Sequence, residues 1–305
     1  MSIGLPYKGS KSEIAEELVA KLPPCGKILD ACCGGGAVLV ALAQSLKYKS
    51  VVGNDKNPAT IALLDAVLIN KGQIEYEHPP VCTRDDFFNS LQRIENGDFT
   101  VQDCVNKYCA SFGNNGQTYL WNDDIASVKI VIEKMLCSRG LANRRLEFRK
   151  FISFLIGEEK FDLKKLENIQ QLQNLERLQR LERLERLERL DNKSIFDVDY
   201  SEFDIVYFDI PYRGTSKYDF EFDYERFYEL FRSLKIPAFL SEYDAPFTVV
   251  SEFDKRRLFQ AVSREKGNVC GLEKLYFNGT LEEYKALMGR FYASKNAEKS
   301  QLSLF

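Results

Sequence analysis

The feature that most constrains the fold is a strand–loop–helix–strand segment near the N-terminus. Residues 27–30 predict a short strand and residues 37–46 an apolar helix, with Gly34, Gly35 and Gly36 between them. Residues 50–55 predict a second strand. Because a helical crossover joins parallel strands, the segment predicts an α/β protein with an open sheet. In such sheets, ligands bind beyond the carboxyl ends of the strands.

The three glycines have the properties of a ligand-binding loop. They allow positive φ angles and close approach of a ligand to the backbone. Their spacing is not that of a dinucleotide-binding loop, because the next glycine is Gly53. Asp55, about twenty residues further on, ends the second strand, where a carboxylate can hold ribose hydroxyls. The glycines alone fit a plain βα turn equally well, but together with Asp55 they favour binding.

A second candidate site follows the apolar run 203–208, which predicts a buried strand. Asp209, Ile210, Pro211 and Tyr212 come directly after it and combine a carboxylate, a proline turn and an aromatic ring. This set suits a planar amine. Asp209 can accept one hydrogen bond from it, a backbone carbonyl the other, and Tyr212 can stack on its ring. The alternative is a turn whose tyrosine fills the core.

In this order along the chain, the motifs resemble those of the Dam-like, phage-type D12 class of DNA adenine-N6 methyltransferases. The resemblance covers most of residues 5–87 and 203–278, and it includes the segments 222–228, 241–243 and 273–276. It implies a Rossmann-like, S-adenosylmethionine-dependent methyltransferase sheet with an inserted, mainly helical target-recognition region. The site residues that it implies are, for the cofactor, Tyr7, Lys11, Asp30, Cys32, Gly34, Gly35, Gly36, Asp55, Asp86 and Phe87, and for catalysis Asp209, Ile210, Pro211 and Tyr212.

The resemblance also gives these residues their roles. Tyr7 and Lys11 belong to a motif that lines the cofactor pocket, and the pair Asp86 and Phe87 contacts the adenine of the cofactor. Ile210 departs from the family, which has a proline there. The family uses the backbone carbonyl of this position, which isoleucine also has. Because a proline follows, residue 210 is still directed toward extended geometry, so we interpret it as a tolerated variant.

The implied reaction is direct transfer of the methyl group to N6 of an adenine flipped out of double-stranded DNA. Asp209 and the carbonyl of Ile210 would hold the amine, with Tyr212 stacked on the base. Three alternatives remain: methylation of cytosine N4, methylation of another amine or an amide in RNA or protein, and a catalytically inactive DNA-binding protein.

The motif order divides the chain into five parts. We expect a cofactor-binding part (1–87), a target-recognition insertion (88–160), a spacer made of Leu-Glu-Arg triplets (161–193), a catalytic part (194–292) and a polar tail (293–305). A polar glycine loop at 111–116, followed by Tyr119 and Trp121, suits base contact in the insertion, and it suits an ordinary turn nearly as well.

The triplet repeat is unusual for a helix. Leucine or isoleucine recurs at every third position from Leu163 to Leu190, so an α-helical stripe would circle the axis instead of forming one apolar face. The composition and the i,i+4 pair of Glu185 with Arg189 nevertheless favour a long helix. A 3₁₀ form would align the leucines, but such helices are short.

Composition narrows the function only in part. A net charge of −3 does not indicate nucleic-acid binding, so DNA contact would need local patches. Candidates are Arg213 with Lys217, and a central group of Arg139, Arg144, Arg145, Arg149 and Lys150. The eight cysteines form no C-x-x-C pair, and no apolar leader or membrane span is apparent, so we expect a reduced, cytoplasmic protein. Cys25 precedes the cofactor loop and does not suit a nucleophile. The single histidine, His78, makes a histidine-based metal site improbable.

The last five residues, Gln301 to Phe305, resemble the motif by which bacterial proteins bind the β sliding clamp. Leu304 and Phe305 would fill a pocket of the clamp and Gln301 would hydrogen-bond at its edge. The alternative is a tail that packs on its own domain.

Overall fold

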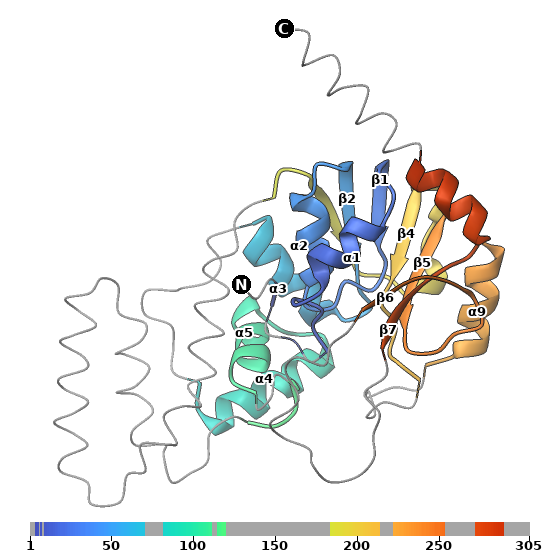
Figure 1. The fold of residues 1–305 in the computed structure, drawn as a ribbon. Coiled ribbons are helices and arrows are strands. Elements are labelled where there is room, and N and C mark those ends of the chain that lie inside the picture. Colours follow the sequence, from blue (N-terminus) through green and yellow to red (C-terminus); the bar gives the residue numbers. More distant parts are fainter. Residues whose placement is uncertain are drawn as a thin grey trace, which may run out of the picture. The chain divides into compact units, whose positions relative to one another are not determined.

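The computed structural model describes residues 4–5, 7, 9–70, 82–111, 115–119, 184–213, 222–253 and 272–289 (Figure 1). By its internal contacts the chain divides into two compact units. The helical unit comprises Met1–Ser10, Gly34–Gly36 and Asn57–Leu184, and the sheet unit comprises Lys11–Cys33, Ala37–Lys56 and Glu185–Phe305. Each is described by itself.

The described strands of the sheet unit form one seven-stranded sheet in the order β3-β2-β1-β4-β5-β7-β6. The strands from β3 to β5 are parallel, and β7 is antiparallel to both β5 and β6. The α/β prediction is thereby confirmed. The strands are β1 (Cys25–Asp30), β2 (Tyr48–Asn54), β3 (Leu187–Asp191), β4 (Ile205–Phe208), β5 (Ala238–Glu242), β6 (Thr248–Phe253) and β7 (Glu273–Phe277).

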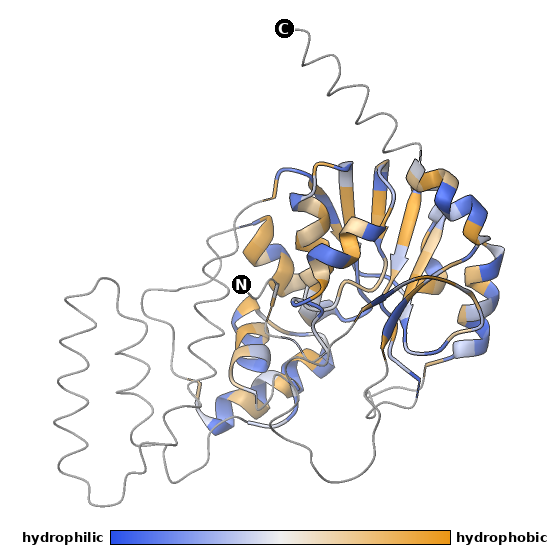
Figure 2. Cartoon of the chain, in the orientation of Figure 1, coloured by the Kyte–Doolittle hydropathy of each residue, from blue (hydrophilic) through white to orange (hydrophobic). Residues whose placement is uncertain are grey.

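The central strands are apolar because side chains cover both of their faces. On one face, α9 (Tyr224–Ser233) packs Phe227 and Phe231 against Phe208 of β4, with ring centroids 5.2 and 6.0 Å from that of Phe208. On the other face lies α2 (Ala37–Gln44), whose Leu39 fills the space above Gly53. Figure 2 shows this concentration of hydrophobic residues along the strands.

On the face of the sheet away from α9, the N-terminal and C-terminal parts of the sheet unit are in contact. Tyr284, in the helical segment 281–289, packs on Phe239 and Phe277. Its hydroxyl donates a 2.9 Å hydrogen bond to the carbonyl of Lys21, which ends α1 (Ala15–Lys21). Tyr284 therefore connects β5 and β7 with the end of α1.

In the helical unit, each described helix begins at a side-chain cap. Asn57 caps α3 (Pro58–Leu68), and Thr83 and Thr100 form capping boxes at α4 (Arg84–Asn96) and α5 (Val101–Cys109). Between α4 and α5, the carboxylate of Asp103 accepts hydrogen bonds from Ser90 and Arg93. Most of α4 and all of α5 lie within the expected insertion 88–160, whose bounds and role stay a prediction.

The helix predicted over 161–193 is wrong at its C-terminal end, because Leu187–Asp191 is strand β3. Helix propensities amount to only tenths of a kcal/mol per residue, and pairing with the edge of β2 outweighs them here. Val51 N donates a 2.9 Å hydrogen bond to Arg186 O, and Leu187 is 8% exposed. Arg189 pairs with Asp191 at 3.1 Å and with Glu202 at 2.9 Å, not with Glu185 as in a helix.

Several expectations fall outside the described residues. They concern residues 161–183 of the repeat, the arginine group at 139–150, Trp121, His78, Lys217 and the tail 293–305.

Candidate active site

The segment from Asp209 to Tyr212 is anchored at the carboxyl end of β4. Ile210 is 2% exposed and packs in the core cluster that contains Phe227. The carbonyl of Pro211 accepts a 3.0 Å hydrogen bond from the hydroxyl of Tyr224 on α9. These two contacts fix the turn, so the residues on either side of Ile210 have defined positions.

A buried lysine connects the two ends of this segment. Lys11 is 3% exposed, and its Nζ lies 2.5 Å from Asp209 Oδ1, 2.5 Å from the hydroxyl oxygen of Tyr212 and 3.2 Å from Glu273 Oε1. The Tyr212 hydroxyl in turn donates a 2.8 Å hydrogen bond to Glu273 Oε1. We call Lys11, Asp209, Tyr212 and Glu273 the lysine cluster.

The electrostatics of the lysine cluster favour an ammonium ion and a neutral phenol. Burial by itself lowers the pKa of Lys11, but the carboxylates of Asp209 and Glu273 outweigh it and raise that pKa above its usual value. Burial, followed by the same two carboxylates, raises the pKa of Tyr212 well above its usual value. The ring of Tyr212 meets that of Tyr243 edge-on, with centroids 4.7 Å apart.

Asp30, at the carboxyl end of β1, is fully buried, and neither carboxylate oxygen has a hydrogen-bond partner among the described residues. Burial, then the negative charges of Asp209 and Asp55, raise the pKa of Asp30 well above its usual value. A buried carboxyl without a donor is costly, and a cationic or hydrogen-donating ligand group would relieve that cost.

The glycine loop in the helical unit is tightly covered by the N-terminal segment. Gly34 and Gly36 have φ angles of 46° and 73°, which favour glycine. A Cβ at Gly35 would lie 2.5 Å from the Cβ of Tyr7, and Leu5 N donates a 2.6 Å hydrogen bond to Gly35 O. The loop thus needs its glycines to let Tyr7 approach.

Asp55 and Cys32 lie at the carboxyl ends of neighbouring strands in the sheet unit. The backbone of Asp55 is fixed by Asn192, whose side chain donates a 2.8 Å hydrogen bond to its carbonyl. Burial, then Asp55 and Asp30, raise the pKa of the Cys32 thiol well above its usual value, so it is not a thiolate nucleophile.

Asp86 and Phe87 have structural roles at the start of α4. Asp86 completes the capping box, accepting a 2.9 Å hydrogen bond from Thr83 N. Phe87 is fully buried and packs against Tyr119, with ring centroids 5.6 Å apart, in a cluster that also contains Cys82. Their contact with the cofactor remains a prediction.

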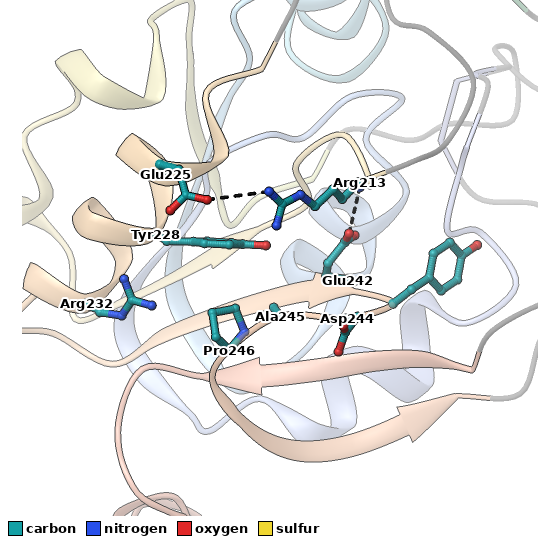
Figure 3. A pocket seen from close by; sticks show the side chains of 9 residues that line it. Arg213, Glu225, Tyr228, Arg232, Glu242, Asp244, Ala245 and Pro246 are labelled. Carbon is teal, nitrogen blue, oxygen red and sulfur yellow. Dashed lines mark hydrogen bonds and ion pairs between the residues drawn. The ribbon is translucent and has the colours of Figure 1, made fainter.

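Beside the turn lies a pocket of about 570 Å³ (Figure 3). Glu242, from the end of β5, accepts a 2.8 Å hydrogen bond from Arg213 N through Oε1, while its buried Oε2 has no partner among the described residues. Burial raises the pKa of Glu242 to about 7. The residues lining the pocket are Arg213, Glu225, Tyr228, Arg232, Glu242, Tyr243, Asp244, Ala245 and Pro246.

Sequence reasoning assigned no role to Glu242 or Glu273, although both lie in segments that resemble the family. The available signal was an acidic residue at the boundary of a buried strand, since Glu242 ends β5 and Glu273 begins β7. Lys11 was expected beside the cofactor, and the structure brings it to Asp209 and Tyr212.

Two further findings concern what the described part of the chain contains. It holds no group of acidic, cysteine or histidine residues arranged to bind a metal ion. Within the same residues, no helix has the length and apolar character needed to span a membrane.

Comparison with known proteins assigns the chain to a family. No curated protein matches the chain. The model of the D12 class N6 adenine-specific DNA methyltransferase family matches residues 7–268, most of the sequence. The chain therefore belongs to the D12 class N6 adenine-specific DNA methyltransferases.

Proposed function

We propose that the methyl group of S-adenosylmethionine is transferred to a flipped adenine at a site built around Asp209. The observation that carries this proposal is the lysine cluster at the end of β4, where Lys11 lies 2.5 Å from Asp209 and from the Tyr212 hydroxyl. The activity of the family, adenine-N6 methylation of DNA, requires an acceptor for the exocyclic amine at such a position.

The chain's own residues would act mainly by position. Asp209 accepts a hydrogen bond from the N6 amine, and the Ile210 carbonyl accepts the second, which orients the nitrogen lone pair. Lys11 places a positive charge beside the Asp209 carboxylate, and Tyr212 lies against the base. Preorganised acceptors and alignment account for the rate. The bound cofactor supplies a methyl group on a positively charged sulfur, so no covalent enzyme intermediate is required.

The residues present fit a cationic cofactor. Asp30 offers two buried oxygens without a donor among the described residues, and the glycine loop allows close approach to its backbone. We propose that Asp30, Cys32 and Gly34 to Gly36 hold the cofactor with Asp55 on its ribose. The remaining cofactor-site residues that the order of the family motifs implies are Tyr7, Lys11, Asp86 and Phe87.

The DNA would be recognised by the insertion 88–160, in line with the motif order, while Arg213 contacts the strand beside the flipped base. We propose that residues 1–87 and 194–292 form the methyltransferase domain and that residues 161–193 form a spacer. We propose a cytoplasmic location, where the substrate DNA lies.

Replacing Asp209 tests this proposal. The purified protein is incubated with DNA and isotopically labelled cofactor, and the DNA is digested to nucleosides. We expect labelled N6-methyladenine from the wild type and none from Asp209→Ala, while cofactor binding, measured calorimetrically, stays within about twofold. Asp197→Ala, an exposed residue of the same unit, is the control. Methylation by Asp209→Ala, or label in N4-methylcytosine, would contradict it.

We further propose that residues 301–305 bind the β sliding clamp as a weak tether that raises the local concentration of enzyme on DNA. Deleting them should slow methylation only when a clamp is loaded on the DNA. An equal rate with and without these residues on clamp-loaded DNA would rule the tether out.

A further inference from the structure

Glu273 is a buried carboxylate that the proposed reaction does not use. It begins β7, it is fully buried, and its Oε1 contacts two groups of the site. Oε1 accepts a 2.8 Å hydrogen bond from the Tyr212 hydroxyl and lies 3.2 Å from Lys11 Nζ. Glutamate and lysine are almost never fully buried unless they are paired, so these contacts explain how both are tolerated here.

The charges of the lysine cluster give Glu273 a consequence for Asp209. One ammonium group lies between two carboxylates, 2.5 Å from Asp209 and 3.2 Å from Glu273. When all three are ionised, the sum is one negative charge. A pair of Lys11 and Asp209 alone would be neutral, and the ammonium would be drawn entirely to Asp209. A second carboxylate therefore preserves the ability of Asp209 to accept a hydrogen bond.

Tyr212 is held by the same carboxylate. Its hydroxyl accepts from Lys11 and donates to Glu273, so both its hydrogen and one lone pair are directed within the cluster. With the edge-on contact to Tyr243, this fixes the plane of the Tyr212 ring. A fixed ring plane is what a stacking residue requires.

We infer that Glu273 is a positioning residue for methyl transfer, which holds the Lys11 ammonium and the Tyr212 hydroxyl so that Asp209 and the tyrosine ring meet the flipped adenine correctly. This inference rests on the proposed function. A structural role in β7 alone would instead affect folding and leave the chemistry of the folded enzyme unchanged.

The variant Glu273→Gln keeps the size of the side chain and removes its charge. We expect kcat to fall ~10- to 100-fold, while KM for DNA and the Kd for the cofactor change less than about twofold. Glu252→Gln is the matched control, since Glu252 on β6 is exposed and lies opposite Lys274, the residue that follows Glu273 on β7. The control should behave as the wild type.

The pH dependence of kcat distinguishes the inference from a purely structural role, because a structural role would leave it unchanged. Around Lys11, the charged groups are the carboxylates of Asp209 and Glu273, with those of Asp30 and Glu242 further away. Removing the Glu273 charge weakens the stabilisation of the ammonium, so the alkaline limb of the kcat profile should move to lower pH. An unmoved limb would count against the inference.

A double-mutant cycle separates the two contacts. If Glu273 acts through Tyr212, then Glu273→Gln should reduce kcat less in a Tyr212→Phe background than in the wild type. Additive effects, or a kcat for Glu273→Gln within twofold of the wild type, would overturn the inference. If the glutamine variant does not fold, Glu273→Asp keeps the charge, shortens the reach and should give the same loss of kcat. Failure of the proposed function would appear separately, as activity in Asp209→Ala.

Discussion

At the residue scale, Ile210 shows how a position can serve the core and the reaction through different atoms. Its side chain is 2% exposed and packs below α9, whereas the proposed contact with adenine uses only its backbone carbonyl. At this position, where the family has a proline, the isoleucine side chain contributes to the core. The acceptor atom itself is unchanged.

This separation predicts the behaviour of Ile210→Ala. Loss of a buried isoleucine should destabilise the protein by roughly 2–5 kcal/mol, measured by denaturant unfolding. At a temperature where the variant is folded, kcat should fall much less than in Asp209→Ala, because the carbonyl remains. Equal losses of kcat in the two variants would show that the isoleucine side chain takes part in the reaction.

Asp30 yields a second prediction at this scale. Its folded-state pKa is raised, so at neutral pH the fold bears the cost of a buried acid that lacks a donor among the described residues. Asp30→Asn should therefore raise the melting temperature without cofactor, by an amount equivalent to roughly 1–3 kcal/mol. The same variant should lose most of the increase that added S-adenosylmethionine gives the wild type. An unchanged increase would remove Asp30 from the cofactor site.

At the scale of elements, β3 is a strand built from a three-residue repeat. The triplet Leu184, Glu185, Arg186 is preceded by an identical triplet. Deleting it therefore leaves the sequence of β3 and the three residues before it unchanged. We expect this deletion to change the free energy of unfolding by less than about 1 kcal/mol.

A one-residue deletion is the matched control. Removing Glu188 would bring Arg186 to the position where Leu187 is buried, because a shift by one residue exchanges the two faces of a strand. That variant should lose several kcal/mol, roughly the cost of a buried leucine. If both deletions lower the free energy of unfolding equally, then the stability of β3 does not depend on which of its residues face the core.

The elements also show what the sequence could predict. β1 ends at Asp30, and Asp55 and Asp209 directly follow β2 and β4, so local pattern sufficed for these three strands and their acids. β3 was missed, since its residues favour helices and only pairing with β2 makes them a strand. The lysine cluster was missed for a related reason. Lys11 and Asp209 are 198 positions apart, and no local pattern reports such a contact.

At the scale of the whole molecule, buried acids predict how stability depends on pH. The folded-state pKa of Glu242 is raised to about 7 and that of Asp30 is also raised, so the unfolded chain loses these protons first as pH rises. Their contribution to stability is present below the ordinary carboxyl pKa and is lost as pH rises toward 7. Asp103 has a lowered pKa, and its contribution changes only in more acidic solution.

The melting temperature without cofactor should therefore fall between about pH 5 and pH 7.5, an effect measurable by calorimetry. In Glu242→Gln the decline should be shallower, because one of the two acids no longer titrates. A melting temperature that rises over this range, or an equal slope in the variant, would contradict the assignment.

The wide separation of its members along the chain gives the lysine cluster a consequence for the order in which the site is completed during synthesis. Lys11 precedes Glu273 by 262 positions (273 − 11), so at roughly 5–20 residues per second the ribosome adds Glu273 many seconds after Lys11. A nascent or prematurely terminated chain that stops before β7 lacks Glu273, and so carries an incomplete set of charges around Asp209. On the inference that Glu273 positions the lysine cluster, we expect methylation to reach its full rate only in chains that extend through β7.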